Sequence, residues 1–452
     1  MSLRGYRAYK PSGVGSLGDL PEHWDCRAFK RVAGRFESGT SVNSVDEPAE
    51  GVAWGVLKTS CVYENRFTPG ENKRILAEEY DRATCPLRAG ALIVSRMNTS
   101  ELVGAAGLVE VSNPHLFLPD RLWQISLTGV EPRFAYWWTQ SASYRAQVEA
   151  ACTGTSASMK NLSQEQLGSF MLPLPEEAEQ HTIAAFLDRE TAKIDALVAE
   201  QERLIELLKE KRQAVISHAV TKGLNPTAQT EPSGIGWLGD VPVGWARMPI
   251  KHCLDRLIDT EHKTAPFYED GQYLVVRTTN VRNGRLVLDG ARYTDIDGYR
   301  EWSRRGTPEP GDIIFTREAP AGEACLVPEG IPLCLGQRTV LMKVDRARLD
   351  PRFALWSLYG GLASEFVEML SQGSTVAHFN MSDIGNIPLM VPPLDEQVEI
   401  AEMLDRHTSR VDRFIAETER AISLAGERRA ALISAAVTGQ IDVRGIVNPE
   451  AA

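Results

Sequence analysis

Cysteine is scarce in this sequence, and its spacing excludes the common uses of paired thiols. The 452 residues include seven cysteines, and no two of them form a Cys-x-x-Cys pair. An odd, scattered set of cysteines argues against a disulfide framework or a zinc ribbon and predicts a reducing, cytoplasmic location. No uncharged apolar run approaches the roughly 18 residues of a membrane span, and the N-terminal segment lacks the apolar core of a signal peptide.

Sequence signatures of catalysis are missing as well. There is no GxxxxGKS/T phosphate loop, no glycine-rich dinucleotide fingerprint, no HExxH metal spacing and no Asn-Pro-Pro-aromatic pocket of amino-methyltransferases. Asp259, Glu261 and Lys263 lie close enough in sequence to suggest a nuclease, but their polar surroundings are more typical of a solvated charge cluster. We therefore predict that the chain performs no chemistry itself and has no catalytic residue, metal site or cofactor of its own.

Positive charge is also in short supply. Acidic residues outnumber basic residues by 60 to 49, which gives a formal net charge of −11. This balance excludes a protein that coats DNA over its whole surface, but it permits a local basic face. Residues 277–305 hold seven arginines and no lysine against four acidic residues. The planar fork of arginine suits guanine edges and phosphate groups, although a solvated face held by ion pairs has the same composition.

The chain is an internal duplication. Residues 11–19, PSGVGSLGD, recur as PSGIGWLGD at residues 232–240. Ordered matches continue along both halves to Ala-Val-Thr at 219–221 and 436–438, while the offset drifts from 221 to 217 residues. Chance does not explain so many identities in the same order, and the two halves are predicted to share one fold.

Each half begins with a part rich in glycine and proline, at residues 10–172 and 231–389. Short apolar and β-branched runs bounded by turn residues predict a mixed, sheet-containing domain in each part. Near the end of the first part, Ser163 and Gln166 fit a capping box and predict the start of a helix.

Each half then continues into a segment that is predicted to be one long helix. Residues 176–222 contain no proline or glycine, and the matching segment has a single internal glycine, Gly426. Heptad spacing in the first segment is carried by Leu187, Ile194, Gln201, Leu208 and Val215, with Leu197 and Leu204 between them. In the second it is carried by Leu404, Val411, Thr418, Ala425 and Leu432, with Phe414 and Ala421. Two such segments favour an antiparallel coiled coil, although a helix packed on its own domain shows the same stripe.

The same motifs mark the start, the helix entry and the helix exit of both halves. Ser-Gly-x-x-x-Leu-Gly-Asp-x-Pro-x-x-Trp opens each half, at residues 12–24 and 233–245. The helix entries contain Leu-Pro or Val-Pro, then Glu-Gln, Ile-Ala and Leu-Asp, and the exits begin with Ala-Val-Thr. Together these motifs resemble the specificity (S) subunit of type I restriction–modification systems over nearly the whole chain. One departure is Ser16, where the second half and the family have tryptophan.

The resemblance implies an α+β chain with two pseudo-repeated mixed α/β target-recognition domains, held apart by two conserved helices that form an antiparallel coiled coil. The recognition domains would span 1–175 and 223–392, the helices 176–222 and 393–438, and a C-terminal tail 439–452. Each domain would read one half of a bipartite, asymmetric double-stranded DNA target.

The resemblance also implies partners. Two modification subunits would bring S-adenosylmethionine and methylate adenine, and restriction subunits would use ATP and Mg for translocation and cleavage. Two alternatives stay open: a stand-alone DNA-binding regulator, and a coiled-coil scaffold with no DNA role, which the arginine-rich segment argues against. Neither the target sequence nor the spacer length between half-sites follows from these residues.

Base contacts are expected where the two repeats differ most. The candidates in the first domain are Lys58, Thr59, Arg66, Arg96, Asn98, Lys160 and Asn161. In the second domain they are Arg277, Thr278, Asn280, Arg282, Arg285, Arg317, Arg338, His378 and Asn380. Arg96 and Arg317 follow predicted strands at equivalent positions, where a structural ion pair is the alternative to a DNA contact. Asn161 and Asn380 precede predicted helices, where capping is the alternative.

Overall fold

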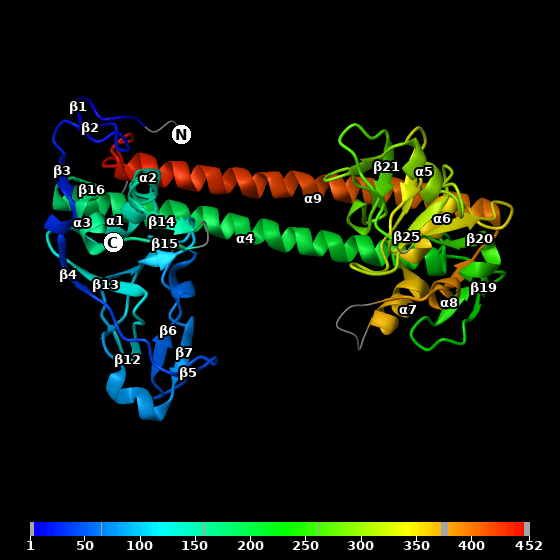
Figure 1. The fold of residues 1–452 in the computed structure, drawn as a ribbon, viewed down its shortest axis with the longest axis horizontal. Helices are drawn as coiled ribbons and strands as arrows, with labels where there is room; N and C mark the ends of the chain where they lie inside the picture. Colours follow the sequence, from blue (N-terminus) through cyan, green and yellow to red (C-terminus); the bar gives the residue numbers. More distant parts are fainter. Residues whose placement is uncertain (1–3, 65, 157–158, 262, 372–377, 447–452) are drawn as a thin grey trace. The chain divides into compact units, whose positions relative to one another are not determined.

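A computed structural model describes residues 4–446, except residues 65, 157–158, 262 and 372–377. The chain forms two units, one of Met1–Gln201 with Arg420–Ala452 and the other of Glu202–Glu419. Two long helices, α4 (Glu177–Lys222) and α9 (Leu394–Val437), each contribute one part to each unit (Figure 1). The combination of sheets and long helices confirms the predicted α+β class.

The first unit contains two principal sheets. One is antiparallel and consists, in spatial order, of β11 (Ala106–Leu108), β9 (Leu92–Ser95), β13 (Leu122–Leu127) and β4 (Ala33–Glu37). The other is mixed and consists of β5 (Ser44–Val45), β7 (Asn72–Ile75), β6 (Gly55–Leu57), β12 (Asn113–Phe117) and β8 (Pro86–Leu87). Shorter strands are β1 (Tyr9–Pro11), β2 (Asp19–Pro21), β3 (Asp25–Ala28), β10 (Met97–Asn98), β14 (Thr153–Ser156), β15 (Met159–Asn161) and β16 (Met171–Leu174). The helices are α1 (Pro132–Thr139), α2 (Ala142–Ala151) and α3 (Gln164–Ser169), with turns η1 (Phe29–Arg31), η2 (Thr59–Val62) and η3 (Ala77–Arg82).

The second unit repeats this arrangement. Its antiparallel sheet consists of β26 (Ala324–Leu326), β25 (Ile313–Thr316), β28 (Thr339–Val344) and β20 (Leu254–Asp259), and its mixed sheet of β24 (Arg292–Thr294), β21 (Tyr273–Val276) and β27 (Leu333–Leu335). Shorter strands are β17 (Thr230–Pro232), β18 (Asp240–Pro242), β19 (Ala246–Pro249), β22 (Val281–Arg282), β23 (Arg285–Leu286) and β29 (Pro388–Val391). The helices are α5 (Ile296–Trp302), α6 (Pro351–Leu358), α7 (Gly361–Ser371) and α8 (Met381–Gly385), with turns η4 (Ile250–Cys253) and η5 (Thr278–Asn280).

The central strand of each antiparallel sheet is apolar on both faces because each face lies against a different core. Successive side chains of a strand point to opposite faces. In β9, Leu92 and Val94 join the core that contains α1 and α2, whereas Ile93 joins the core under the mixed sheet. Ile313 and Ile314 divide between two cores of the second unit in the same way. A strand covered on both faces is a continuous apolar run, which is the pattern the sequence displays.

The long helices pair antiparallel inside each unit. In the first unit Leu187 of α4 shares a core with Ile433 of α9, and further along α4 Asp195 accepts from Arg429 Nε at 2.9 Å. In the second unit Arg212 Nε donates to Asp412 at 3.0 Å, and Ile216 shares a core with Leu404. As residue numbers rise along α4 they fall along α9, so the predicted antiparallel coiled coil is confirmed.

The phase of the heptads differs from the prediction. The residues that repeat every seven positions from Leu187 face the partner helix, as predicted. The second row of seam residues lies four positions after the first and begins with Thr191, whereas the prediction placed it three positions after. Leu197 and Leu204, predicted to complete the stripe, have 48% and 42% of their surface exposed. Phe414 is 48% exposed and Ala421 is also exposed. Residues three and four positions after a seam residue both lie near the same face of the helix. In this structure the partner helix covers the residue four positions after it and leaves the residue three positions after it exposed.

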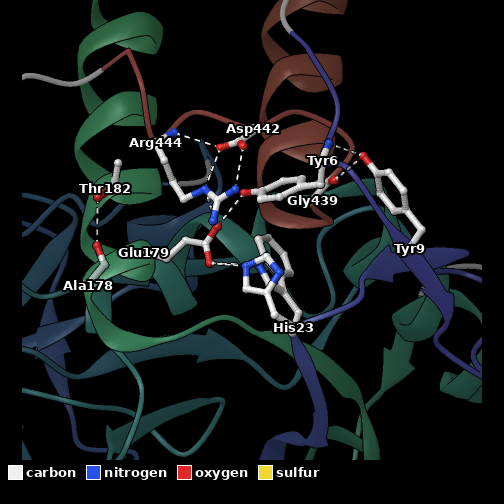
Figure 2. Close-up of polar contacts among 10 residues, drawn as sticks. Tyr6, Tyr9, His23, Ala178, Glu179, Thr182, Gly439, Asp442 and Arg444 are labelled. Atoms are coloured by element: carbon white, nitrogen blue, oxygen red, sulfur yellow. Dashed lines mark hydrogen bonds and ion pairs between the residues drawn. The ribbon is translucent and has the colours of Figure 1, made fainter.

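The ends of the described chain meet at the first turn of α4, in a group of side chains around Glu179 (Figure 2). The buried Glu179 carboxylate accepts from the Tyr6 hydroxyl at 2.7 Å and from Trp24 Nε1 at 3.1 Å, and His23 Nε2 lies 3.0 Å away. Arg444 lies 3.6 Å from the same carboxylate and stacks on the Tyr6 ring. In the second unit Glu396 accepts from Trp245 Nε1 at 3.1 Å, so the tryptophan–carboxylate contact is common to both repeats.

Candidate nucleic-acid interface

In the first unit, four predicted contacts gather around β10, β15 and turn η2. Thr59 Oγ1 lies 2.7 Å from the Tyr63 hydroxyl, which accepts from Asn98 Nδ2 at 2.9 Å. Asn98 stands opposite Lys160 on the β10–β15 ladder, and Asn161 is the next residue along it. The structure therefore brings Thr59, Asn98 and Lys160 together, whereas Asn161, the next residue of β15, directs its side chain to the opposite face.

Arg96 lies directly after β9 and close to the same surface. Its guanidinium carbon is 5.8 Å from the centroid of the Trp123 ring. Its Nε is buried and has no hydrogen-bond partner among the described residues. The Arg96 guanidinium stacks on a ring and has no acidic partner in the described part of the chain, so its charge is available to an anionic ligand. Its contact with DNA stays a prediction.

Arg66 lies elsewhere. It forms an exposed ion pair with Glu64 at 2.9 Å and lines a cavity of about 450 Å³ with Arg133, Tyr136 and Asp188. Burial raises the pKa of Asp188, which accepts from Arg133 at 2.6 Å. This cavity is walled by an internal ion pair, and no other predicted contact lines it.

Arg317, the counterpart of Arg96, has a structural role instead of the predicted DNA contact. Its side chain is 9% exposed, donates to Asp259 at 2.8 Å and donates through Nε to the Phe379 carbonyl at 3.0 Å. The ion-pair alternative is therefore correct for Arg317. The partner lies 58 residues away in sequence, which is why local pattern could not reveal it.

Thr278 and Asn280 also serve the fold, which corrects two further predictions. Asn280 is fully buried; its Nδ2 donates to the Val287 carbonyl at 2.9 Å and its Oδ1 accepts from the Arg277 amide at 3.1 Å. Thr278 is 8% exposed and donates to the Ala319 carbonyl at 3.0 Å. Both side chains hold turn η5 in place, and their hydrogen bonds to the backbone account for their burial.

The two asparagines predicted before helices behave differently. Asn380 is the N-cap of α8, and its Oδ1 accepts from the Asp383 amide at 2.9 Å, so the capping alternative is correct there. Asn161 lies in β15, and the following helix is capped by Ser163. The capping box of Ser163 with Gln166 is confirmed, with Gln166 N donating at 3.1 Å.

Most arginines of the 277–305 segment are held by acidic side chains. Arg285 pairs with Asp412 of α9 at 3.0 Å, Arg300 with Asp297 at 3.7 Å, and Arg304 and Arg305 both pair with Glu261. Within the described part of the chain, no acidic partner is found for Arg277, Arg282 or Arg292. The ion-paired face left open as an alternative therefore accounts for four of the seven arginines.

Two of the remaining arginines meet at a cavity of about 140 Å³ at the edge of the mixed sheet. Arg277, Arg292 and Arg338 line it, together with threonine side chains, Gln337 and Phe267. Arg338 and the predicted contact His378 both lie near Glu318, at 3.3 and 3.6 Å, and Glu318 is not among the lining residues. Arg292 was not among the predicted contacts. The pairing of β21 with β24 shows its place, because Arg292 stands opposite Val275, and Val275 lies two residues before Arg277.

Comparison with known proteins finds similarity to specificity subunits of type I restriction enzymes. Residues 258–422 match the family model described as Type I restriction modification DNA specificity domain. The protein described as the MjaX specificity subunit of a type I restriction enzyme, from Methanocaldococcus jannaschii, is 19% identical over 95% of this chain and 96% of its own length. The chain is thus similar to type I restriction–modification specificity subunits over nearly its whole length, and its residues 258–422 match their DNA specificity domain. The EcoBI specificity subunit of a type I restriction enzyme from Escherichia coli is 23% identical over 64% of this chain and 62% of its own length.

Solved structures of the family share the fold. A chain from a study of complex assembly and conformational transition of the type I R-M system has a TM-score of 0.68 at 17% identity, covering 92% of this chain and 98% of its own. The HsdS subunit from Thermoanaerobacter tengcongensis has a TM-score of 0.51 at 17% identity, covering 93% and 98%. Among the described residues, no helix is long and apolar enough to cross a membrane.

Proposed function

We propose that this chain is the DNA sequence-specificity subunit of a type I restriction–modification complex. It reads a bipartite, asymmetric target with one recognition domain for each half-site, and it positions partner subunits. The observation that carries the proposal is the repetition of one sheet-and-helix unit with different basic side chains at equivalent positions. Two diverged readers in one chain suit two different half-sites, whereas a symmetric dimer suits a palindrome.

The proposal divides the work among subunits. Modification subunits supply S-adenosylmethionine and methylate adenine at N6, and restriction subunits supply ATP- and Mg-dependent translocation and cleavage. This chain supplies phosphate contacts that set the register on the duplex and base contacts that select the sequence. In the first unit this task is assigned to the side chains around β10 and β15, which are Thr59, Arg96, Asn98, Lys160 and Asn161.

The experiment replaces residues 10–172 with the matching domain of another family member and assembles the chimera with the methyltransferase partner. Methylation sequencing should find one half of the bipartite target changed and the other retained. Changes in both halves would contradict one domain per half-site.

Partner dependence gives a second readout. The highly purified chain alone should methylate nothing, because catalysis is assigned to the partners. Tight, specific binding of a labelled duplex by the chain alone, unchanged when the methyltransferase is added, would favour a stand-alone regulator instead.

A further inference from the structure

The two units carry cations at three equivalent positions of the chain, two of them on or directly after strands of the mixed sheet. Val56 stands opposite Lys73 on one ladder, and Val275 stands opposite Arg292 on the matching ladder. Two residues after each valine come Lys58 and Arg277. The third position is filled by Arg121 and Arg338, whose carbonyls accept from the Arg96 and Arg317 amides at 3.1 and 2.9 Å. Three cations have thus been kept at these positions although the surrounding loops have diverged.

In the first unit a carboxylate of the protein itself, that of Asp46, lies between two of the cations. Asp46 Oδ1 is 3.1 Å from Lys58 Nζ and 3.3 Å from Lys73 Nζ. The two ammonium groups hold the pKa of Asp46 below its usual range. The first unit therefore displays, in its own side chains, an anion bound at this position.

In the second unit the described residues that line the same place include no acidic side chain. The loop before β6 contributes Asp46, whereas the loop before β21 contributes Phe267, whose ring centroid is 4.3 Å from the Arg292 guanidinium carbon. Arg277 Nη2 donates to the Gly290 carbonyl at 2.6 Å, but its buried Nε has no partner among the described residues. Burial and the positive charge of Arg292 both lower the pKa of Arg277. Two like charges beside a buried, unused donor are the arrangement that a bound anion relieves.

We propose that the cavity lined by Arg277, Arg292 and Arg338, the arginine pocket, binds one phosphate group of the DNA backbone. The inference rests on the proposed function, because it names a contact of the same recognition domain. At about 140 Å³ the arginine pocket is far smaller than the roughly 300 Å³ at which pockets for whole small-molecule ligands begin, so it suits a single anionic group better than a nucleotide. Guanidinium forks bind phosphate oxygens in pairs, and two exposed lining threonines, Thr264 and Thr279, add hydroxyl donors.

The test uses the full chain assembled with its methyltransferase partner and a fluorescently labelled duplex, with affinity measured by anisotropy at several KCl concentrations. Arg292→Gln should weaken binding about 10- to 100-fold at low salt, as expected for the loss of a charged hydrogen bond. It should also reduce the slope of log K against log salt by about one unit, the value for one phosphate contact. The matched control is Arg300→Gln, an exposed arginine of the same segment that pairs with Asp297 and does not line the arginine pocket.

A second variant leaves all three arginines in place. Phe267→Asp introduces a carboxylate next to Arg292 and copies the arrangement of Asp46, so it should compete with phosphate and reproduce the loss of affinity and of slope. Phe267→Asn is its uncharged control and should retain the wild-type slope. Phe267 is 54% exposed, so neither change disturbs a core.

The outcomes separate this inference from the proposed function. If Arg292→Gln and Phe267→Asp both retain the wild-type slope of log K against log salt, the proposal that the arginine pocket binds phosphate is wrong, whatever the sequence preference. Equal wild-type affinity for every duplex sequence would instead contradict the proposed function, while the slopes measured on the same duplexes would still decide the arginine pocket.

Discussion

Replacing Glu179 with alanine removes the carboxylate on which both terminal segments of the first unit converge (Figure 2). Two buried donors lose their acceptor, the Tyr6 hydroxyl at 2.7 Å and Trp24 Nε1 at 3.1 Å. His23 Nε2 also loses its contact, but its side chain is 41% exposed and can bind water instead. The repeat supplies an internal reference, because the matching Glu396→Ala deprives the single donor Trp245 Nε1.

The magnitudes follow from the donors left without partners. A buried donor without an acceptor costs about 1–3 kcal/mol. Glu179→Ala should therefore lower the local free energy of unfolding by about 2–6 kcal/mol, and Glu396→Ala by about 1–3 kcal/mol. Arg444 adds little to this difference, because its side chain is 49% exposed and also pairs with Asp442.

Hydrogen–deuterium exchange read by mass spectrometry measures the two units separately in one chain. Peptides covering residues 4–24 should lose more protection in Glu179→Ala than peptides covering residues 227–245 lose in Glu396→Ala. A loss in Glu396→Ala equal to or larger than that in Glu179→Ala would refute the reasoning, because the donors would then not set the cost.

Three further predictions concern single side chains. Asp259→Asn removes the anion that pairs with the nearly buried Arg317 guanidinium. It should lower the free energy of unfolding, measured in urea, by about 2–4 kcal/mol, slightly less than the loss of one partner of a fully buried ion pair. A loss of DNA affinity at unchanged stability would contradict this structural role. Arg285→Ala breaks an exposed ion pair with Asp412, so it should lower the free energy of unfolding by less than about 1 kcal/mol and leave DNA affinity unchanged. A loss of about 1–3 kcal/mol in binding free energy would instead support the predicted base contact of Arg285. Burial and the adjacent carboxylate raise the pKa of Tyr6, so its contribution to stability is complete below the unfolded pKa of about 10 and is lost as pH rises above it; the unfolding free energy of Tyr6→Phe should fall less steeply above pH 10, by at most about 1.4 kcal/mol per pH unit, and identical slopes would count against the Tyr6 assignment.

Much of the architecture could be predicted from local pattern. The repeated opening motif, the glycine-poor segments and the capping box at Ser163 correspond to structure that depends on nearby residues. Candidate contacts were predicted less well, because an arginine in a divergent loop has the same local sequence whether it faces DNA or an acid. Arg317 and Arg285 find Asp259 and Asp412 through tertiary contacts, and no local pattern distinguishes them from Arg277.

The amino-acid sequence by itself determined the duplication, the alternation of sheet domain and long helix, and the period of the apolar stripe. These properties are written in identities and spacings along one strand or helix. Tertiary structure alone decided the phase of the seam, where Thr191 is buried and Leu197 is exposed, because a partner helix selects one of two adjacent stripes. It also decided which cations keep their charge available, because carboxylates such as Asp259 and Asp412 come from distant segments. Asp46 lies between two lysines in one unit, whereas in the other Phe267 stands at its place and Arg277 and Arg292 have no acidic partner among the described residues.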